Sequence, residues 1–357
     1  MSLGQSIGSS LGRAIGSSLA AGDGVVGGSI PVAWDWTPGT RVAIAFYGDS
    51  ITLGAYAGAT ESDWIADGYV ALLRQTLQSR HGDGGIGLIG LWRGEWTKTG
   101  VWSQITDFGL FSHCWSASND AAKLWTLTVS EGDNIDLFYL RGAGYGAFDV
   151  VVDGGAAVTI TPAGSADDSA QRANVSLGSE GAHTIVVKAP ASGTLYFLGG
   201  AVYKGETGVV LHNIGNSSAV VGDLGYLAEK KLDIVSILAP RLHVVGFVAN
   251  DFSAQQALGT YQAYQTAVIT QIKLAGGDLM SWIPPDNDLT RAIPIGSYEA
   301  IARNVSADNG GCWLDIHRSW GDYSSNIARM YDTVHPNTLG HAAIHDTMLA
   351  LFERMGG

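Results

Sequence analysis

The chain has 357 residues, of which 46% are hydrophobic and 15% charged, and its 33 acidic and 20 basic residues give a net charge of −13. This composition argues against a disordered chain, and no run of about 18 apolar residues predicts a membrane-spanning helix. Nucleic-acid binding is also disfavoured, because it depends on lysine and arginine contacts to phosphates. The length predicts about two domains.

The first 24 residues form a glycine-rich leader. Residues 2–9, SLGQSIGS, and 10–17, SLGRAIGS, are an eight-residue repeat in which leucine or isoleucine and glycine both recur every four residues. In a helix this spacing places a ridge of leucine and isoleucine beside a row of glycines without side chains, which lets a second helix approach closely. Two interpretations remain open: a flexible tail, or a segment (residues 1–22) that docks on copies of itself or on a virion or tail partner. The leader lacks the basic and apolar regions of a secretory signal.

An α/β pattern begins at about residue 25 and continues to residue 89. The apolar run from Val42 to Tyr47 predicts a strand that ends at Gly48. Residues 62–80 predict a helix with Ser62 as its cap.

Residues 90–205 have a different pattern. Short β-type runs alternate with Gly, Asp, Asn and Pro turns at intervals of about ten residues, which predicts an antiparallel β-sandwich. Trp92, Trp96 and Trp102 lie at its beginning. They are candidates for stacking on a sugar ring, although packing in the core is the favoured interpretation.

The α/β pattern returns over residues 206–357. Strands are predicted at VVLHNIG (209–215), LHVVGFVAND (242–251), LMSWIPP (279–285) and CWLDIH (312–317), and helices at 219–239, 254–276, 297–308 and 338–355. Alternation of this kind is typical of a parallel sheet covered by helices. The β-rich block is therefore predicted to be inserted into one α/β domain.

Chemically suggestive residues follow several of these strands. Ser50 comes directly after the first strand and at the start of a helix, where the helix N-terminus stabilises negative charge. Asp332 and His335 lie three residues apart in a loop before the last helix, a spacing that lets the carboxylate orient the imidazole toward a serine. Gly215 and Asn250 follow two other strands and are candidate donors to an oxyanion.

At these residues the chain resembles the SGNH hydrolases, also called GDSL esterases. The resemblance rests on GDSI at 48–51, NIGNSSA at 213–219, AND at 249–251 and DTVHP at 332–336, four motifs in the family's order. It implies a flavodoxin-like three-layer α/β/α fold, with Ser50 as nucleophile, His335 and Asp332 completing a triad, and Ser50 N–H, Gly215 and Asn250 holding the oxyanion. Val248 and Ser218 stand where the family usually has glycine, which affects the expected oxyanion geometry but not the triad.

The inserted block suggests the substrate. Its segments GAFDVVVDGG and AHTIVVK resemble parts of the galactose-binding-type jelly rolls that accompany carbohydrate-active SGNH esterases. The resemblance therefore implies an acetylesterase that removes O-acetyl groups from a carbohydrate, acting outside the cell or on a virion. The alternatives are a lipid or general carboxylesterase, a glycan-binding module without catalysis, and a virion subunit with esterase activity as a side function.

No cofactor is expected. No His, Asp or Glu spacing indicates a metal site, and the DND at 286–288 is too short to predict a calcium loop. Asp49 and Asp251 are interpreted as structural hydrogen-bonding groups beside the catalytic positions. Four histidines near the motifs are interpreted as ordinary loop or helix residues: His212, His317, His341 and His345.

Two cysteines, Cys114 and Cys312, are too few for a disulfide scaffold or a four-thiolate zinc site. Whether they pair is left open, and two buried thiols are the favoured interpretation.

Overall fold

The computed structural model describes residues 25–28, 39–162 and 168–355, so the repeat of the leader lies outside the described residues. Its central sheet has five parallel strands: β2 (Arg41–Gly48), β14 (Gly208–Gly215), β15 (Leu242–Gly246), β16 (Asp278–Ile283) and β17 (Cys312–Asp315). They lie in the order β14-β2-β15-β16-β17, and β1 (Val25–Gly28) pairs antiparallel with β17 at the edge. In chain order this is 2-1-3-4-5, the flavodoxin-like arrangement. The sequence prediction of a parallel sheet is confirmed.

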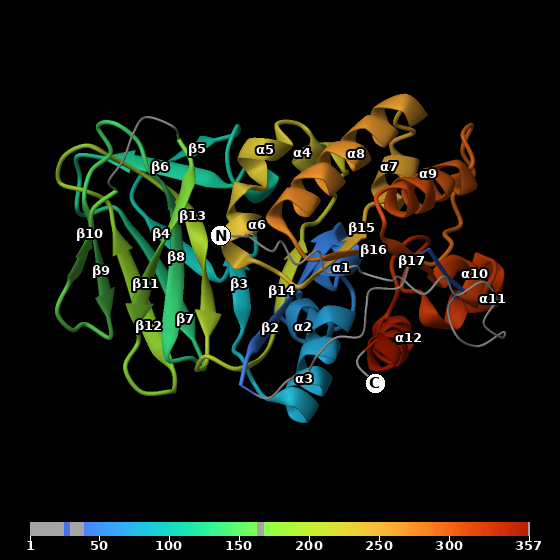
Figure 1. Ribbon diagram of the computed structural model, residues 1–357, viewed down its shortest axis with the longest axis horizontal. Coiled ribbons are helices and arrows are strands. Elements are labelled where there is room, and N and C mark those ends of the chain that lie inside the picture. Colours follow the sequence, from blue (N-terminus) through green and yellow to red (C-terminus); the bar gives the residue numbers. More distant parts are fainter. Residues whose placement is uncertain (1–24, 29–38, 163–167, 356–357) are drawn as a thin grey trace, which may run out of the picture.

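Strand β2 shows why the sheet is covered on both faces. Ile44 and Phe46 pack into one core together with α3 (Tyr69–His81) and α12 (Thr338–Met355), whereas Ala45 and Tyr47 pack into another core with α8 (Leu258–Ala275) and α9 (Ile295–Asp308). Because successive side chains of a strand point to opposite faces, both sets have to be apolar. In Figure 1, α3 and α12 lie below the sheet and α8 and α9 above it.

The other helices are short and sit mainly in the loops around this sheet. They are α1 (Ser50–Leu53), α2 (Glu61–Asp67), α4 (Gly222–Gly225), α5 (Ala228–Lys231), α6 (Asp233–Leu238), α7 (Ala249–Ser253), α10 (Ile316–Trp320) and α11 (Tyr323–Asn326), with 3₁₀ turns η1 (Leu110–Ser112) and η2 (Ile327–Arg329). Among the described residues, no helix is both long and apolar enough to cross a membrane.

The predicted helix over residues 62–80 is two helices. Thr60, not Ser62, is the cap of α2, and its hydroxyl accepts a hydrogen bond from the Asp63 N–H. Gly68 then takes an extended conformation and separates α2 from α3. A Cβ at Gly68 would lie 2.6 Å from the Gly54 Cα, so the break lets the chain pack closely against the end of α1.

The predicted helix over 219–239 is wrong in its continuity, because α4, α5 and α6 are three separate short helices. Gly222 and Gly225 weaken the helix, Tyr226 is extended, and Leu227 has a left-handed φ of 55°. The other three predictions are confirmed with small shifts: α8 begins at Leu258 rather than 254, α9 begins at Ile295 rather than 297, and α12 spans 338–355 as predicted.

Two antiparallel sheets lie between α3 and β14 in the chain. One has the order β10-β9-β12-β7-β4 and the other the order β11-β8-β13-β6-β5, with β3 also paired to β13. Their strands are β3 (Gly87–Gly90), β4 (Trp96–Thr99), β5 (Ser103–Ile105), β6 (Cys114–Ser118), β7 (Leu124–Val129), β8 (Asn134–Leu140), β9 (Phe148–Val152), β10 (Val158–Ile160), β11 (Ala170–Ser176), β12 (His183–Lys188) and β13 (Thr194–Tyr203). The β-rich pattern thus begins at residue 87, a few residues before the predicted 90.

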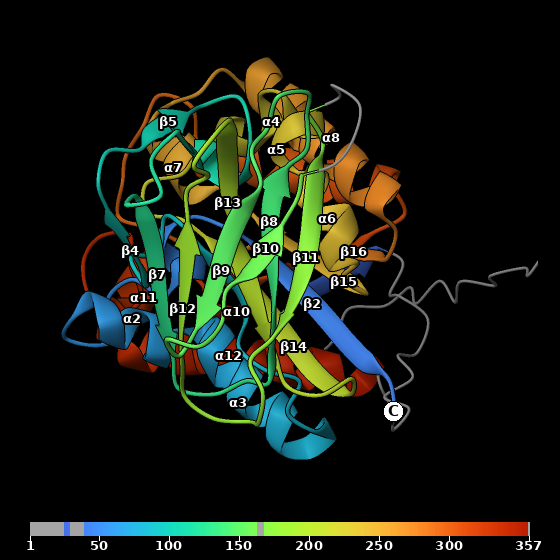
Figure 2. The same cartoon turned by 90° about the vertical axis from the view of Figure 1, so that its left-hand side faces the viewer.

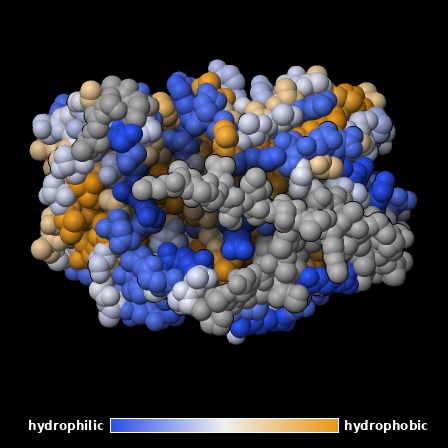
Figure 3. Space-filling view, viewed as in Figure 1, coloured by the Kyte–Doolittle hydropathy of each residue, from blue (hydrophilic) through white to orange (hydrophobic). Residues whose placement is uncertain are grey.

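These two sheets share a core. It contains Leu127 and Ile185 from one sheet and Leu137 and Phe197 from the other. Figure 2 views the molecule from the side of these sheets, with β7, β12 and β9 toward the viewer. The opposite side chains of β12 are only half-buried, and in Figure 3 the left-hand end of the molecule shows both hydrophilic and hydrophobic residues.

Strand β8 joins the antiparallel sheets to the α/β part. Ile135 and Leu137 face the core between the two sheets, whereas Phe138 and Leu140 belong to the core that also contains α8 and α9. Since both faces of β8 are buried, the antiparallel sheets are fixed against the region that carries the loops described next.

Candidate active site

Ser50 lies where β2 gives way to α1, at the carboxyl edge of the sheet. Asp49 caps the helix, because its Oδ1 accepts a hydrogen bond from the Ile51 N–H at 2.9 Å, and Ser50 is the first helical residue. Its N–H therefore has no acceptor within the helix. Burial raises the pKa of Asp49 to about 6. The capping aspartate fixes the turn on which the serine hydroxyl is presented.

Asp332 and His335 share one tight loop before α12. Asp332 Oδ1 accepts hydrogen bonds from the backbone N–H groups of Val334 at 2.8 Å and His335 at 2.7 Å. Burial alone would raise the pKa of Asp332, but these two N–H groups and the His335 ring lower it below its usual value. The loop is closed by the Tyr331 N–H, which donates to the His335 carbonyl at 2.8 Å. The carboxylate is thus kept ionised next to the imidazole.

The structure brings the three predicted residues into a continuous hydrogen-bonded line. The Ser50 Oγ lies 2.9 Å from His335 Nε2, and His335 Nδ1 lies 2.8 Å from Asp332 Oδ2. Although 285 positions separate Ser50 from His335 in sequence, β2 and the loop before α12 end at the same edge of the sheet. A serine beside an imidazole that a carboxylate orients has the geometry required for an activated nucleophile.

The two predicted oxyanion donors differ in whether they have an N–H group that is not already hydrogen-bonded. The Gly215 N–H already donates to Asn213 Oδ1 at 3.0 Å, and a Cβ at Gly215 would lie 2.2 Å from the Leu53 nitrogen. Gly215 therefore acts in this structure as a position of close packing against α1. Asn250 uses one amide hydrogen to bond the Ala219 carbonyl at 3.0 Å, which leaves the second available.

The loop between these two residues contains a donor that the sequence interpretation had not assigned. Ser218 has a left-handed φ of 61° and lies directly before Ala219, the residue whose carbonyl Asn250 contacts. Among the hydrogen bonds of the described residues, none involves the Ser218 N–H. Its position in the sequence, where the SGNH hydrolases that the chain resembles usually have glycine, is the signal that could have found it.

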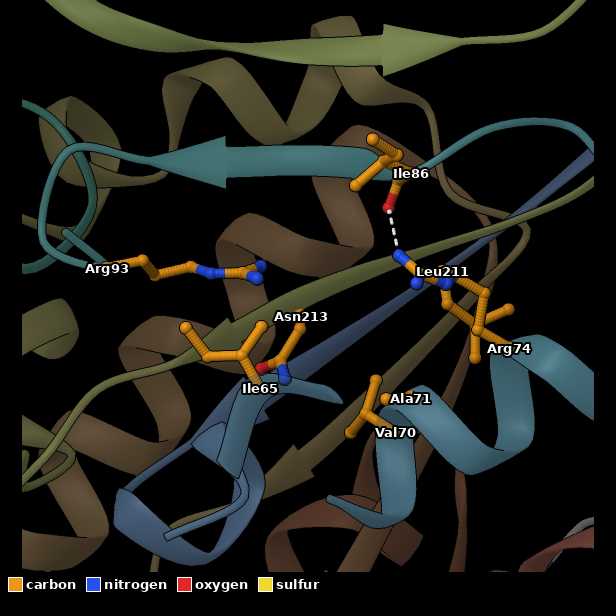
Figure 4. A pocket seen from close by; sticks show the side chains of 8 residues that line it. All are labelled: Ile65, Val70, Ala71, Arg74, Ile86, Arg93, Leu211 and Asn213. Atoms are coloured by element: carbon orange, nitrogen blue, oxygen red, sulfur yellow. Dashed lines mark hydrogen bonds between the residues drawn. The ribbon is translucent and has the colours of Figure 1, made fainter. Parts of the chain in front are cut away.

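A small cavity is lined by residues of α2, α3 and β14 and by two residues that flank β3. Its volume is about 20 Å³, room for about one water molecule. Figure 4 shows the side chains that line it: Ile65, Val70, Ala71, Arg74, Ile86, Arg93, Leu211 and Asn213. Arg93 also donates to the Leu88 carbonyl at 3.1 Å and pairs with Glu95 at 2.8 Å. These contacts tie the segment that follows β3 back onto β3.

Aromatic rings that the sequence interpretation missed lie beside His335. The Tyr56 ring lies 4.8 Å from His335 and stacks on Tyr331 at 4.2 Å and 13°, and it also contacts Trp64 at 4.8 Å. Tyr331 is 62% exposed although it directly precedes Asp332. No sequence pattern links residues 56, 64 and 331, because only the fold brings them together.

The tryptophans proposed for sugar binding are placed differently. Trp96 and Trp102 are 4% and 5% exposed in the core between the two antiparallel sheets, so their ring faces are not open to a ligand and that proposal is wrong for both. The strands that carry or follow them direct these large apolar rings inward. Trp92 is half-buried, and its Nε1–H donates to the Gly215 carbonyl at 2.8 Å.

The neighbouring polar residues have mostly structural contacts. Asp251 accepts a hydrogen bond from the Val221 N–H, and burial raises its pKa to about 7. His341 lies 3.0 Å from the Ala55 carbonyl, and burial lowers its pKa to about 4. His212 and His345 contact Leu88 N and Thr76 Oγ1 respectively, while Cys114 and Cys312 are buried free thiols.

No protein-family model matches the chain, and no curated protein is significantly similar to it in sequence. Several solved structures are similar. A peptidoglycan O-acetylesterase superposes with a TM-score of 0.65 at 16% identity, over 88% of this chain and 93% of that one. An acetylxylan esterase from Geobacillus stearothermophilus (13% identity, 89% and 96% covered) and an alpha/beta hydrolase from the metagenome of Lake Arreo (14%, 91% and 100%) have TM-scores of 0.43 and 0.44. This chain therefore has the fold of the peptidoglycan O-acetylesterase over nearly its whole length.

Proposed function

We propose that the protein is a serine esterase of SGNH type, with Ser50 as nucleophile, His335 as general base and Asp332 as the group that orients His335. The observation that carries the proposal is the line of hydrogen bonds from Ser50 Oγ through the imidazole to Asp332, at 2.9 and 2.8 Å. A serine that only capped a helix would have no need of this partner.

The reaction follows from the geometry. As Ser50 Oγ attacks the ester carbonyl, its proton moves to His335 Nε2, and Asp332 stabilises the imidazolium that forms. The tetrahedral intermediate collapses, the alcohol leaves with the proton from His335, and the acyl group remains on Ser50. His335 then activates a water molecule, which attacks the acyl-enzyme, releases the acid and restores the serine.

The developing oxyanion needs hydrogen-bond donors. We assign this role to the Ser50 N–H, the free amide hydrogen of Asn250 and the Ser218 N–H. Ser218 replaces the expected Gly215, whose N–H is engaged by Asn213. Donors that are fixed in advance typically contribute about 3 kcal/mol each to the transition state.

For the substrate we propose an O-acetylated carbohydrate. The exposed Tyr331 ring, stacked on Tyr56 beside His335, supports this assignment because aromatic faces bind the apolar faces of sugars. The fold shared with a peptidoglycan O-acetylesterase makes an acetylated cell-wall glycan, met outside the cell, the first substrate to test. The antiparallel sheets would then serve as an inserted domain that holds the polymer.

The decisive variant is Ser50→Ala. We expect it to lower the turnover of p-nitrophenyl acetate by at least about 10⁴-fold, since a triad without its nucleophile retains little activity. Ser79→Ala, which removes an exposed hydroxyl on α3, is the matched control and should leave turnover unchanged. Equal activity of the wild type and Ser50→Ala would refute the proposal.

A series of p-nitrophenyl esters with different acyl chains, together with a second variant, tests the substrate class. An acetylesterase should cleave acetate faster than butyrate or octanoate, and Tyr331→Ala should slow the deacetylation of an acetylated glycan but not of p-nitrophenyl acetate. Fastest cleavage of octanoate would favour a lipid esterase instead.

A further inference from the structure

A cluster of metal-ligand side chains lies next to the loop of Asp332 and His335. It consists of Asp286, in the loop after β16, His317, in α10 after β17, and Asp322, at the cap of α11. Each offers one ligand atom, and all these atoms lie within 4.8 Å of one another. Because β16 and β17 are parallel, the loops after them meet at the same edge of the sheet as Ser50.

His317 is held in the orientation of a metal ligand. Its Nδ1 lies 2.5 Å from Oε1 of Glu299, a carboxylate that is only 4% exposed on α9. Nε2 therefore faces outward and lies 3.7 Å from Asp286 Oδ1, too far for a hydrogen bond. Two ligands of one ion, each about 2.1 Å from it, lie about 3.5 Å apart in a tetrahedral arrangement. A carboxylate behind the distal ring nitrogen is a recurrent feature of histidine ligands.

The charges of the cluster also favour a cation. Among the described residues, neither Asp286 nor Asp322 forms an ion pair with lysine or arginine. Two neighbouring carboxylates repel each other, and a divalent ion between them would remove that repulsion. One imidazole with two carboxylates suits a divalent transition metal such as Zn²⁺ or Mn²⁺.

The cluster is connected to the catalytic loop on two sides. Asp286 Oδ2 accepts a hydrogen bond from the Tyr323 N–H at 3.1 Å, and the Tyr323 hydroxyl donates to the Asp332 carbonyl at 3.3 Å. In addition, the Asp288 N–H donates to the Thr333 carbonyl at 3.0 Å. An ion held by the cluster would thus stabilise the two segments on which this loop rests.

We propose that Asp286, His317 and Asp322 bind one divalent transition-metal ion, with Glu299 orienting His317, and that the ion stabilises the loop carrying Asp332 and His335. The ion has a structural role and takes no part in acyl transfer. Binding at this site does not depend on the proposed function, although an effect on turnover would.

The test measures metal binding and thermal stability directly. Protein stripped with EDTA is titrated with Zn²⁺, Mn²⁺ and Ca²⁺ in equilibrium dialysis with elemental analysis, and its melting temperature is followed. We expect one Zn²⁺ or Mn²⁺ ion per chain at micromolar concentration, weaker binding of Ca²⁺, and a higher melting temperature with the bound ion. Ser50→Ala should bind the metal like the wild type, which separates this proposal from the esterase proposal.

Asp322→Asn is the diagnostic variant, because Asp322 is exposed and its loss should leave the fold intact. It should weaken binding at least about tenfold and abolish the metal-dependent rise in melting temperature, while the exposed control Asp308→Asn should bind like the wild type. His317→Gln should have the same effect as Asp322→Asn. Failure of the wild type to bind either ion, or equal binding by Asp322→Asn, would overturn the proposal and leave His317 as a hydrogen-bond partner of Glu299.

Discussion

At the scale of single residues, the short distances around His335 depend on backbone groups as much as on the triad itself. The Asp332 carboxylate accepts hydrogen bonds from two N–H groups of its own loop, and the Asp49 carboxylate accepts one from the Ile51 N–H. These contacts fix the carboxylate of Asp332 and the turn that carries Ser50, so both partners of His335 are held in place before any substrate arrives. Electrostatic catalysis requires this kind of preorganisation.

Asn250 offers a test of the oxyanion assignment. Asn250→Ala should lower kcat for p-nitrophenyl acetate by about 10²–10³-fold, because one donor to the tetrahedral oxygen is lost, while KM changes little. Steady-state kinetics check this, and circular dichroism confirms the fold. Asn309→Ala, which removes a side-chain amide at the end of α9, is the control. A loss confined to KM would place Asn250 in substrate binding instead.

The sequence pointed to Ser50, Asp332 and His335 because the proposed chemistry of each segment is local. Ser50 follows an apolar strand, and Asp332 and His335 are three residues apart, so each half of the site is visible in one short segment. The Tyr56–Tyr331 stack and the cluster of Asp286, His317 and Asp322 were not predicted, because their members come from separate loops that meet only in the fold. Asp286 and His317, taken one at a time, gave no metal-binding pattern in the sequence. For Trp96 and Trp102, composition could not distinguish a ligand platform from a core.

At the scale of elements, the strands and the long helices follow from their apolar patterns, whereas the helix breaks do not. Gly68, Gly222 and Gly225 each lie within a helical pattern, and a sequence does not reveal which glycine a helix tolerates. The structure shows that Gly68 and Gly225 are sites of close approach, to Gly54 and Tyr264 respectively. The low helix propensity of glycine permits these breaks, and tertiary packing decides at which glycine they occur.

The close approach of β14 to α1 makes Gly215 a sensitive position. Gly215→Ala would place a Cβ 2.2 Å from the Leu53 nitrogen and 2.7 Å from the Thr52 carbonyl carbon, both of them backbone atoms. Since α1 begins with Ser50, we expect a loss of about 1–3 kcal/mol in the free energy of unfolding and a fall in kcat. Chemical denaturation and kinetics measure these two effects.

A glycine with open space around it is the control for this substitution. Gly259→Ala on α8 meets no atom within 4 Å and should leave stability unchanged or raise it by up to about 1 kcal/mol. Unchanged stability and activity of Gly215→Ala would show that the contact between β14 and α1 is not tight in solution.

At the scale of the whole molecule, the antiparallel sheets and the α/β part are joined through shared core residues and through Asp233. Asp233, at the start of α6, accepts a hydrogen bond from the Ala170 N–H of β11 at 2.7 Å. Its other carboxylate oxygen is buried without a hydrogen-bond partner. Burial raises the pKa of Asp233 to about 7, so this junction favours the neutral acid.

This raised pKa gives a pH dependence of known sign. Between about pH 4 and pH 7 the folded protein holds a proton on Asp233 that the unfolded chain has released, so the contribution of Asp233 to stability is complete below pH 4 and is lost as the pH rises to 7. Asp233→Asn, which is neutral at every pH, should therefore gain stability relative to the wild type on going from pH 4 to pH 8, by up to about 4 kcal/mol. Urea denaturation at several pH values measures this difference, with Asp67→Asn on α2 as an exposed control. An identical pH dependence of Asp233→Asn and the wild type would contradict this account of the junction.

The central claim is that Ser50 is a nucleophile activated by His335, and covalent labelling tests it most directly. An alkyl fluorophosphonate forms a bond from phosphorus to an activated serine oxygen and releases fluoride, while the serine proton passes to the neighbouring base. Intact-mass and peptide mass spectrometry should show one adduct, on the peptide that contains Ser50, and labelling should stop turnover. The adduct should be absent from His335→Ala even though Ser50 is still present. Labelling of another serine with Ser50 unmodified, or equal labelling of the wild type and His335→Ala, would contradict the account.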